Sequence, residues 1–72
     1  MNNNKNIFET TCIINKDTGS LIKDNISLNL YKDNEDKYIV EYKEKNIIKK
    51  GVYDIFEEAA SDYRLIYHGE RI

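Results

Sequence analysis

The chain of 72 residues has one cysteine, one histidine, and no proline or tryptophan. A single cysteine excludes an internal disulfide framework and fits a reducing compartment such as the cytoplasm. One cysteine and one histidine are also too few for a structural zinc site. No apolar run exceeds a few residues, so we expect neither a membrane span nor a signal peptide. These absences predict a cytoplasmic protein without a metal or cofactor.

The residues that carry proton transfer or nucleophilic attack are also scarce. Cys12 falls within an expected strand with no histidine paired to it by spacing, which favours a small buried hydrophobic residue over a nucleophile. His68 falls at the end of an expected helix, where a cation is stabilising. Glu57 and Glu58 are adjacent and point in different directions on a helix, unlike a catalytic carboxylate pair. The acidic loop 33–36 lacks the glycine and distal glutamate of an EF-hand. We therefore expect a protein that is not an enzyme.

The length allows one domain with one small core. Asn, Lys and Ile are abundant, and the formal net charge of −2 gives neither a basic footprint for nucleic acid nor a polyanionic tail. Residues 1–6 have nothing to bury and are expected to form a disordered leader. Residues 7–72 are expected to form the single domain.

Alternation of apolar and polar residues predicts four strands, over residues 7–14, 21–31, 37–43 and 47–53. The composition of residues 15–20 predicts a turn, since Asn and Asp side chains can hydrogen-bond to their own backbone and Gly19 can take a positive φ. The second strand is expected to be interrupted near Asp24 and Asn25.

One choice of register at each turn gathers the large apolar residues on a single face of the sheet. The pairs that follow from loops at 32–36 and 44–46, with Asn46 in a left-handed conformation, are Leu30 with Tyr38, Leu28 with Val40, Ile26 with Tyr42, Tyr42 with Ile48 and Tyr38 with Val52. Pairing Ile14 with Ile22 brings Phe8 opposite Leu28. Because an odd shift would turn core residues to water, this consistency favours a four-stranded antiparallel meander.

Two strands fit this register less well. In the first strand, Phe8, Cys12 and Ile14 form one apolar side and Ile7 and Ile13 the other, so its facing is ambiguous. In the fourth strand, Lys50 falls on the buried face opposite Val40. We expect Lys50 to lie at an edge, with its methylenes over the core and its ammonium in water.

The last segment predicts an amphipathic helix over residues 55–68. Its apolar residues recur at the helical period: Phe56, Ala59, Ala60, Tyr63, Ile66 and Tyr67. Asp54 as N-cap with Glu57 three residues later would make a capping box. Gly69 suits the left-handed position after the helix. The predicted fold is therefore α+β, a four-stranded antiparallel β-meander with one C-terminal α-helix packed on one face.

Candidate contact residues follow from the predicted register. Tyr31, Lys37 and Tyr53 would form a row on the face away from the helix, with Ile39 beside them. Tyrosine suits contact surfaces because it offers a large area and one polar group, although a bare sheet face commonly shows some aromatics. The acidic helix residues Glu57, Glu58 and Asp62 are a second choice, and a solvated helix face explains them more simply. The expected partner is a larger protein.

Two other functions stay open. Lys43, Lys45, Lys49 and Lys50 cluster around the second hairpin and could bind the phosphates of a nucleic acid, although Glu41 and Glu44 interrupt them and a solvated rim is the simpler explanation. A homodimer or structural subunit, joined by an edge strand or the open sheet face, is the other alternative, because the core is thin.

The turn Asn-Lys-Asp-Thr-Gly-Ser (15–20) and the strand-to-helix run Gly-Val-Tyr-Asp-Ile-Phe-Glu-Glu-Ala-Ala (51–60) stand in a short chain rich in Asn, Lys and Ile. In style this chain resembles small proteins of phages and other mobile elements in AT-rich bacteria, including anti-CRISPR inhibitors. The resemblance transfers no functional residue. It implies an inhibitor that occupies the surface of a host nucleic-acid-handling or defence complex.

Overall fold

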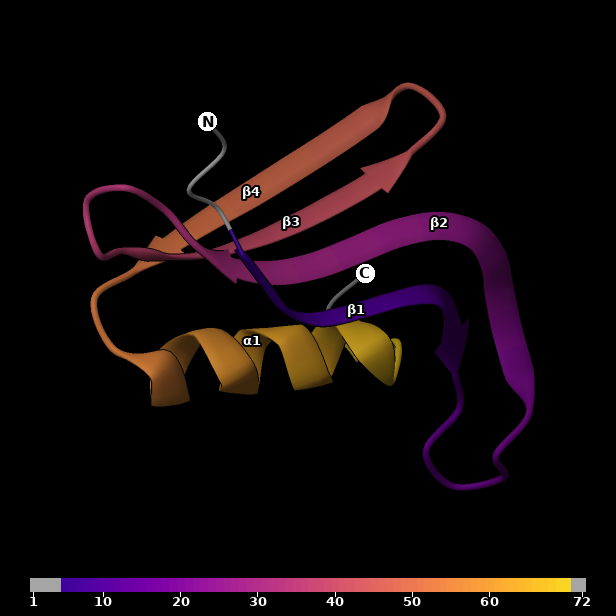
Figure 1. Ribbon diagram of the computed structural model, residues 1–72. Helices are drawn as coiled ribbons and strands as arrows, with labels where there is room; N and C mark the ends of the chain where they lie inside the picture. The colour runs from indigo at the N-terminus through magenta and orange to yellow at the C-terminus, as the bar shows by residue number, and fades with distance from the viewer. Residues whose placement is uncertain (1–4, 71–72) are drawn as a thin grey trace.

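The computed structural model describes residues 5–70 and contains four strands followed by one helix. The elements are β1 (Lys5–Ile14), β2 (Leu21–Lys32), β3 (Tyr38–Glu44), β4 (Ile47–Tyr53) and α1 (Phe56–Tyr67). Each strand pairs antiparallel with the next, and α1 packs against one face of the sheet (Figure 1). The predicted α+β meander with a C-terminal helix is confirmed. Of the expected leader, residues 1–4 lie outside the described residues, and Lys5 and Asn6 belong to β1.

The core lies between the sheet and α1. Its buried side chains come from every element except β4: Ile13, Ile26, Leu28, Leu30, Val40, Tyr42 and Ala59. The predicted helix stripe packs against this cluster through partly buried residues: Phe56, Ala60, Tyr63, Ile66 and Tyr67. The inward-facing apolar residues of β2 and the apolar stripe of α1 therefore pack against each other at one interface, which encloses the small core.

A line of aromatic rings joins α1 to the sheet. The ring centroid of Phe8 lies 5.9 Å from that of Phe56 and 5.6 Å from that of Tyr63. Phe56 meets Tyr38 edge-on at 5.8 Å, and Tyr63 stacks on Tyr67 at 6.4 Å. Such pairs add about 0.5–1.5 kcal/mol each beyond their buried area. They hold α1 over β1, although much of the Phe8 ring remains exposed.

The Tyr63 phenol gives a pH-dependent test of this packing. Burial raises the pKa of Tyr63 to about 12, and Tyr67 adds to the rise. The buried site stabilises the fold only while the Tyr63 phenol is neutral. Because the ordinary phenol pKa is 10.0, this contribution to the free energy of unfolding is complete below pH 10.0 and is lost as the pH rises toward 12. A titration followed by phenolate absorbance should show a late component that Tyr63→Phe removes. A late component of undiminished size in the variant would contradict this assignment.

The β2–β3 register differs from the expected one by two residues. Leu28 pairs with Tyr42 and Leu30 with Val40, and the loop comprises residues 33–37. The side chain of Asp33 organises this loop, because its Oδ1 accepts hydrogen bonds from the backbone N–H groups of residues 35 and 37, both at 2.9 Å. An even shift keeps the same residues on the core face, so the error left the expected core unchanged.

The β3–β4 register was wrong by one residue. A two-residue turn of Lys45 and Asn46 joins the strands, with the positive φ of 46° on Lys45 and not on Asn46. Gly51 therefore lies opposite Val40, and Lys50 lies opposite Glu41. The odd shift places Lys50 on the outer face of the sheet, which overturns its expected position on the buried face.

Gly51 is central to the observed register of β4. A Cβ atom at Gly51 would lie only 2.9 Å from the ring of Tyr53. The missing side chain lets the Tyr53 ring lie over the strand on the α1 side, where it packs against the core. The expected register had placed Ile48 and Val52 inward, opposite Tyr42 and Tyr38. In the structure Lys49 and Tyr53 occupy those two positions.

Bulges bend the β1–β2 hairpin. Its register shifts between Asn6 and Phe8, between Thr10 and Cys12 and between Ile13 and Ile14, and Asn25 has a φ of 59°. β2 runs without a break through Asp24 and Asn25, so a bulge in its pairing with β1 stands where the interruption was expected, and the hairpin curls past the C-terminal end of α1 (Figure 1). The expected pairs of this hairpin were wrong: Phe8 lies opposite Leu30, and Ile14 lies opposite Leu21. Beyond the bulge Ile13 enters the core.

The C-terminal end of α1 matches the prediction from the sequence, and the N-terminal end does not. Gly69 has a φ of 72° and donates to the carbonyl of Ile66 at 2.9 Å, while the N–H of Glu70 donates to Leu65 at 2.7 Å. This is the predicted left-handed C-terminal cap. The predicted N-terminal capping box was wrong, because Ile55 is the N-cap and makes no side-chain cap. The Asp54 carboxylate instead pairs with the ammonium of Lys37.

Candidate functional site

The predicted row of contact residues does not form. Tyr31 lies on the outer face, away from α1, but Lys37 lies in the β2–β3 loop with its ammonium on Asp54. Tyr53 lies on the α1 side, because the register of β4 is shifted by one residue. Ile39 is on the outer face but only 5% exposed. The interpretation of Tyr31, Lys37 and Tyr53 as one patch was therefore wrong.

The shifted register builds a different row. Cross-strand pairing aligns Tyr31, Ile39 and Val52 on the outer face, and we call these three residues the outer row. Val52 is 60% exposed, and Ile48, four residues earlier on the same face of β4, is 66% exposed. Lys50 lies between them and has its ammonium 3.8 Å from Glu41. The β4 side of the outer face thus presents two large aliphatic side chains with a cation between them.

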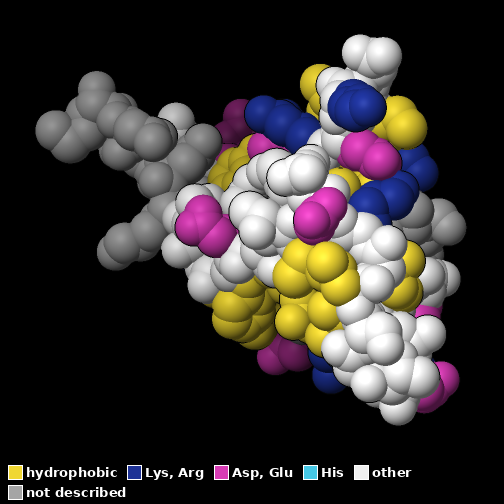
Figure 2. Space-filling model, turned by 90° about the vertical axis from the view of Figure 1, so that its right-hand side faces the viewer, with side chains coloured by type: hydrophobic (Ala, Val, Ile, Leu, Met, Phe, Trp, Pro, Cys, Tyr) yellow, Lys and Arg dark blue, Asp and Glu magenta, His cyan; other side chains and the backbone are white. Residues whose placement is uncertain are grey.

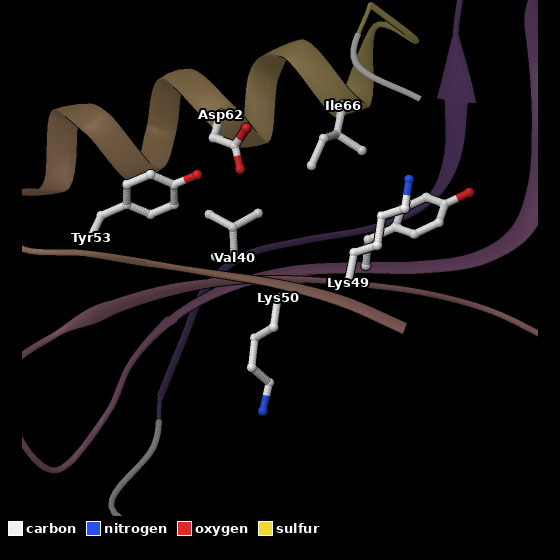
Figure 3. A pocket seen from close by; sticks show the side chains of 8 residues that line it. Val40, Lys49, Lys50, Tyr53, Asp62 and Ile66 are labelled. Carbon is white, nitrogen blue, oxygen red and sulfur yellow. The ribbon is translucent and has the colours of Figure 1, made fainter. Parts of the chain in front are cut away.

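The acidic side of α1 is divided. Glu57 and Glu58 are exposed in its first turn, as expected. Asp62 is only 8% exposed and lines a hollow of about 200 Å³ between α1 and β4, so its expected place on an exposed acidic surface was wrong. Figure 3 shows the Asp62 carboxylate and the Tyr53 phenol turned toward each other within this hollow. Asp62 therefore belongs to the packing of α1 on the sheet.

The lysines of the second hairpin are also divided. Figure 3 shows Lys49 on the α1 side of β4 and Lys50 on the opposite side. Lys43 lies with Lys50 on the outer face, and its ammonium is 4.0 Å from Glu41. At the end of the molecule where both hairpin tips lie, basic, acidic and hydrophobic side chains are intermixed (Figure 2). The four lysines thus do not form one continuous basic surface.

A polar cluster ties the bent part of β2 to β3. The Lys23 ammonium and the Tyr42 hydroxyl both donate to Oε1 of Glu44, at 3.0 and 2.8 Å. Lys23 lowers the pKa of the Glu44 carboxyl, and burial raises the pKa of the Tyr42 phenol. All three groups are engaged with one another, so the cluster is a structural link. Lys23 is too far in sequence from Tyr42 and Glu44 for spacing to have indicated the cluster.

The geometry of residues 5–70 was compared with that of a metal centre and of a membrane span. Among residues 5–70, no three His, Cys, Asp or Glu side chains come together as metal ligands would. In the same range no helix has the length and apolar character needed to cross a bilayer. No family model, curated protein or solved structure matches the chain. On its geometry, the outer row with Ile48 is the best-formed contact surface of the described residues.

Proposed function

We propose that the protein is a non-enzymatic binding module that occupies a surface on a larger protein through the β4 side of its outer sheet face. The observation that supports this is the pair of exposed aliphatic side chains, Ile48 and Val52, on the same face of the sheet as Tyr31. Scattered exposed apolar residues are ordinary, but here they share one face of one strand.

Magnitudes show what these side chains can supply. Burying both would contribute on the order of 2–4 kcal/mol, because full burial of one such side chain is worth about 1.5–3 kcal/mol and each is already partly covered. A micromolar complex needs about 8 kcal/mol. The remaining affinity therefore has to come from Tyr31, from charges or from the backbone of β4.

The concrete form that we propose is an inhibitor of a host nucleic-acid-handling or defence complex, of the anti-CRISPR type. A small module without catalytic groups inhibits by covering a surface, so its effect depends on affinity. Direct binding of nucleic acid has less support, because the lysines are divided between two faces and two of them lie near Glu41. Dimerisation through the same face is the other alternative, and sedimentation tests it.

The test compares two faces of one strand. Val52→Glu and Ile48→Glu should each weaken capture of the partner from a lysate of the source cells by about tenfold or more, equivalent to about 1.4 kcal/mol. Ile47→Glu is the matched control, because Ile47 is exposed on the same strand but has the opposite facing. Circular dichroism checks that each variant is folded. Capture that is unchanged in the first two variants, or equally weakened in all three, would contradict the proposal, as would recovery of no partner.

A further inference from the structure

The two edges of the sheet differ in their ability to accept an added strand. The register of β1 shifts at three places, and bulges of this kind obstruct further pairing. β4 instead pairs with β3 in one unbroken register from Ile47 to Tyr53. It is the last strand of the sheet, and no strand within residues 5–70 pairs with its other side. β4 is therefore the open edge.

The backbone groups available on this edge follow from its turn. In an antiparallel ladder, alternate residues point their N–H and C=O groups away from the partner strand. Glu44 and Ile47 close the two-residue turn and thus form a hydrogen-bonded pair. Counting from them, the outward residues are Ile48, Lys50 and Val52. The same three residues carry the exposed side chains of the outer face.

The charges on β4 select among possible occupants. Lys49 and Lys50 lie in the middle of the strand, one on each face. Within residues 5–70, Lys49 has no carboxylate within 4.0 Å, and Lys50 has Glu41 at 3.8 Å. A second copy of β4 added antiparallel would bring the two lysine pairs together, and like charges across strands are destabilising. An acidic strand would instead find a complementary charge on each face.

We propose that β4 binds an extended segment of the partner protein by strand addition, and that this segment carries Asp or Glu opposite Lys49 and Lys50. Its flanking residues on the outer face are apolar and cover Ile48 and Val52. Backbone hydrogen bonds to the outward groups of β4 supply the affinity that the aliphatic side chains lack. This inference rests on the proposed function and specifies the chemistry of the partner.

The experiment selects short random peptides, displayed on phage, on the immobilised full-length protein. The selected peptides should share acidic residues at their centre flanked by β-branched residues. A synthetic peptide with that consensus should shift the amide NMR signals of residues 47–53. The double variant Lys49→Glu, Lys50→Glu should weaken its binding by on the order of tenfold or more.

A proline variant isolates the backbone contribution. Lys50→Pro removes an outward N–H group that the β3–β4 ladder does not use, a position where an edge strand tolerates proline. It should abolish peptide binding, whereas Lys50→Gln, which removes the charge and keeps the N–H group, should retain most of it. Equal binding by both variants would overturn the inference. Selected peptides without acidic residues, no selected peptide, or a dimer of the free protein in sedimentation would also overturn it.

This outcome is separable from that of the proposed function. If peptide selection fails but Val52→Glu still releases the natural partner, strand addition is wrong and the outer-face function stands. If peptides bind β4 but the natural partner is insensitive to Val52→Glu and Ile48→Glu, the proposed function is wrong.

Discussion

Replacing Leu28 by alanine should lower the free energy of unfolding by about 2–5 kcal/mol, the usual cost of truncating a fully buried leucine. Leu28 is completely buried between β1, β3 and α1, so the vacated space has no solvent to fill it. Urea denaturation followed by circular dichroism measures the loss. Since stability scales as roughly 0.05–0.15 kcal/mol per residue, a chain of 72 residues has about 4–11 kcal/mol in total, so this loss is a large share of it.

Leu21→Ala is the matched control for this prediction. Leu21 lies at the start of the same strand but is mostly exposed, so its truncation should change stability by less than about 0.5 kcal/mol. Equal losses for Leu28→Ala and Leu21→Ala would show that α1 and the sheet do not enclose the core described here.

The second large effect is expected at Ile13, where the sequence and the structure disagree. Sequence alternation places Ile7 and Ile13 on the same side of the first strand, so truncation of either should cost the same. In the structure Ile13 is 1% exposed and Ile7 is 39% exposed, because the bulge reverses the facing of β1 between them. Ile13→Ala should therefore destabilise by about 2–4 kcal/mol and Ile7→Ala by about 1 kcal/mol or less.

The comparison of Ile13→Ala with Ile7→Ala thus tests the bulge itself. The same urea denaturation measures the free energy of unfolding of both variants. A larger loss for Ile13→Ala than for Ile7→Ala supports the bulge. A larger loss for Ile7→Ala would mean that β1 keeps an unbroken alternation and that the curled hairpin is wrong.

The parts of the fold that were predictable are those set by period and composition. The alternation of Ile26, Leu28 and Leu30 and the helical stripe from Phe56 to Tyr67 identified the core, because burial of one face imposes those periods. The two-residue error in the β2–β3 register did not change which residues face the core, since the side-chain period of a strand is two. The glycine cap of α1 was likewise predictable, because few residues other than Gly take a positive φ at that position.

The errors came from side-chain contacts that neither the period nor the composition of a segment indicates. The turn at Lys45 and Asn46 contains two residues, whereas the three-residue turn was predicted because it places Ile48 and Val52 on the core face. Gly51 and the fold-back of Tyr53 decided between them, and no local pattern reveals that contact. In the same way, Asp54 was expected to cap the helix, but Lys37 from the β2–β3 loop competes for its carboxylate.

The candidate site depended on the least predictable feature. With Tyr53 turned to the α1 side, the expected row was lost, and Val52 and Ile48 came to the outer face in its place. Only Tyr31 and Ile39 of the expected patch remain together there, as direct neighbours across β2 and β3. The proposed binding surface is thus a consequence of a one-residue difference in the pairing of β4.

Nuclear Overhauser contacts between β3 and β4 test that difference most directly. The structure requires cross-strand contacts between Val40 and Gly51 and between Tyr38 and Tyr53. Contacts of Val40 with Lys50 and of Tyr38 with Val52 would instead establish the register that buries Ile48 and Val52, and would contradict both the outer-face site and the acidic-strand partner.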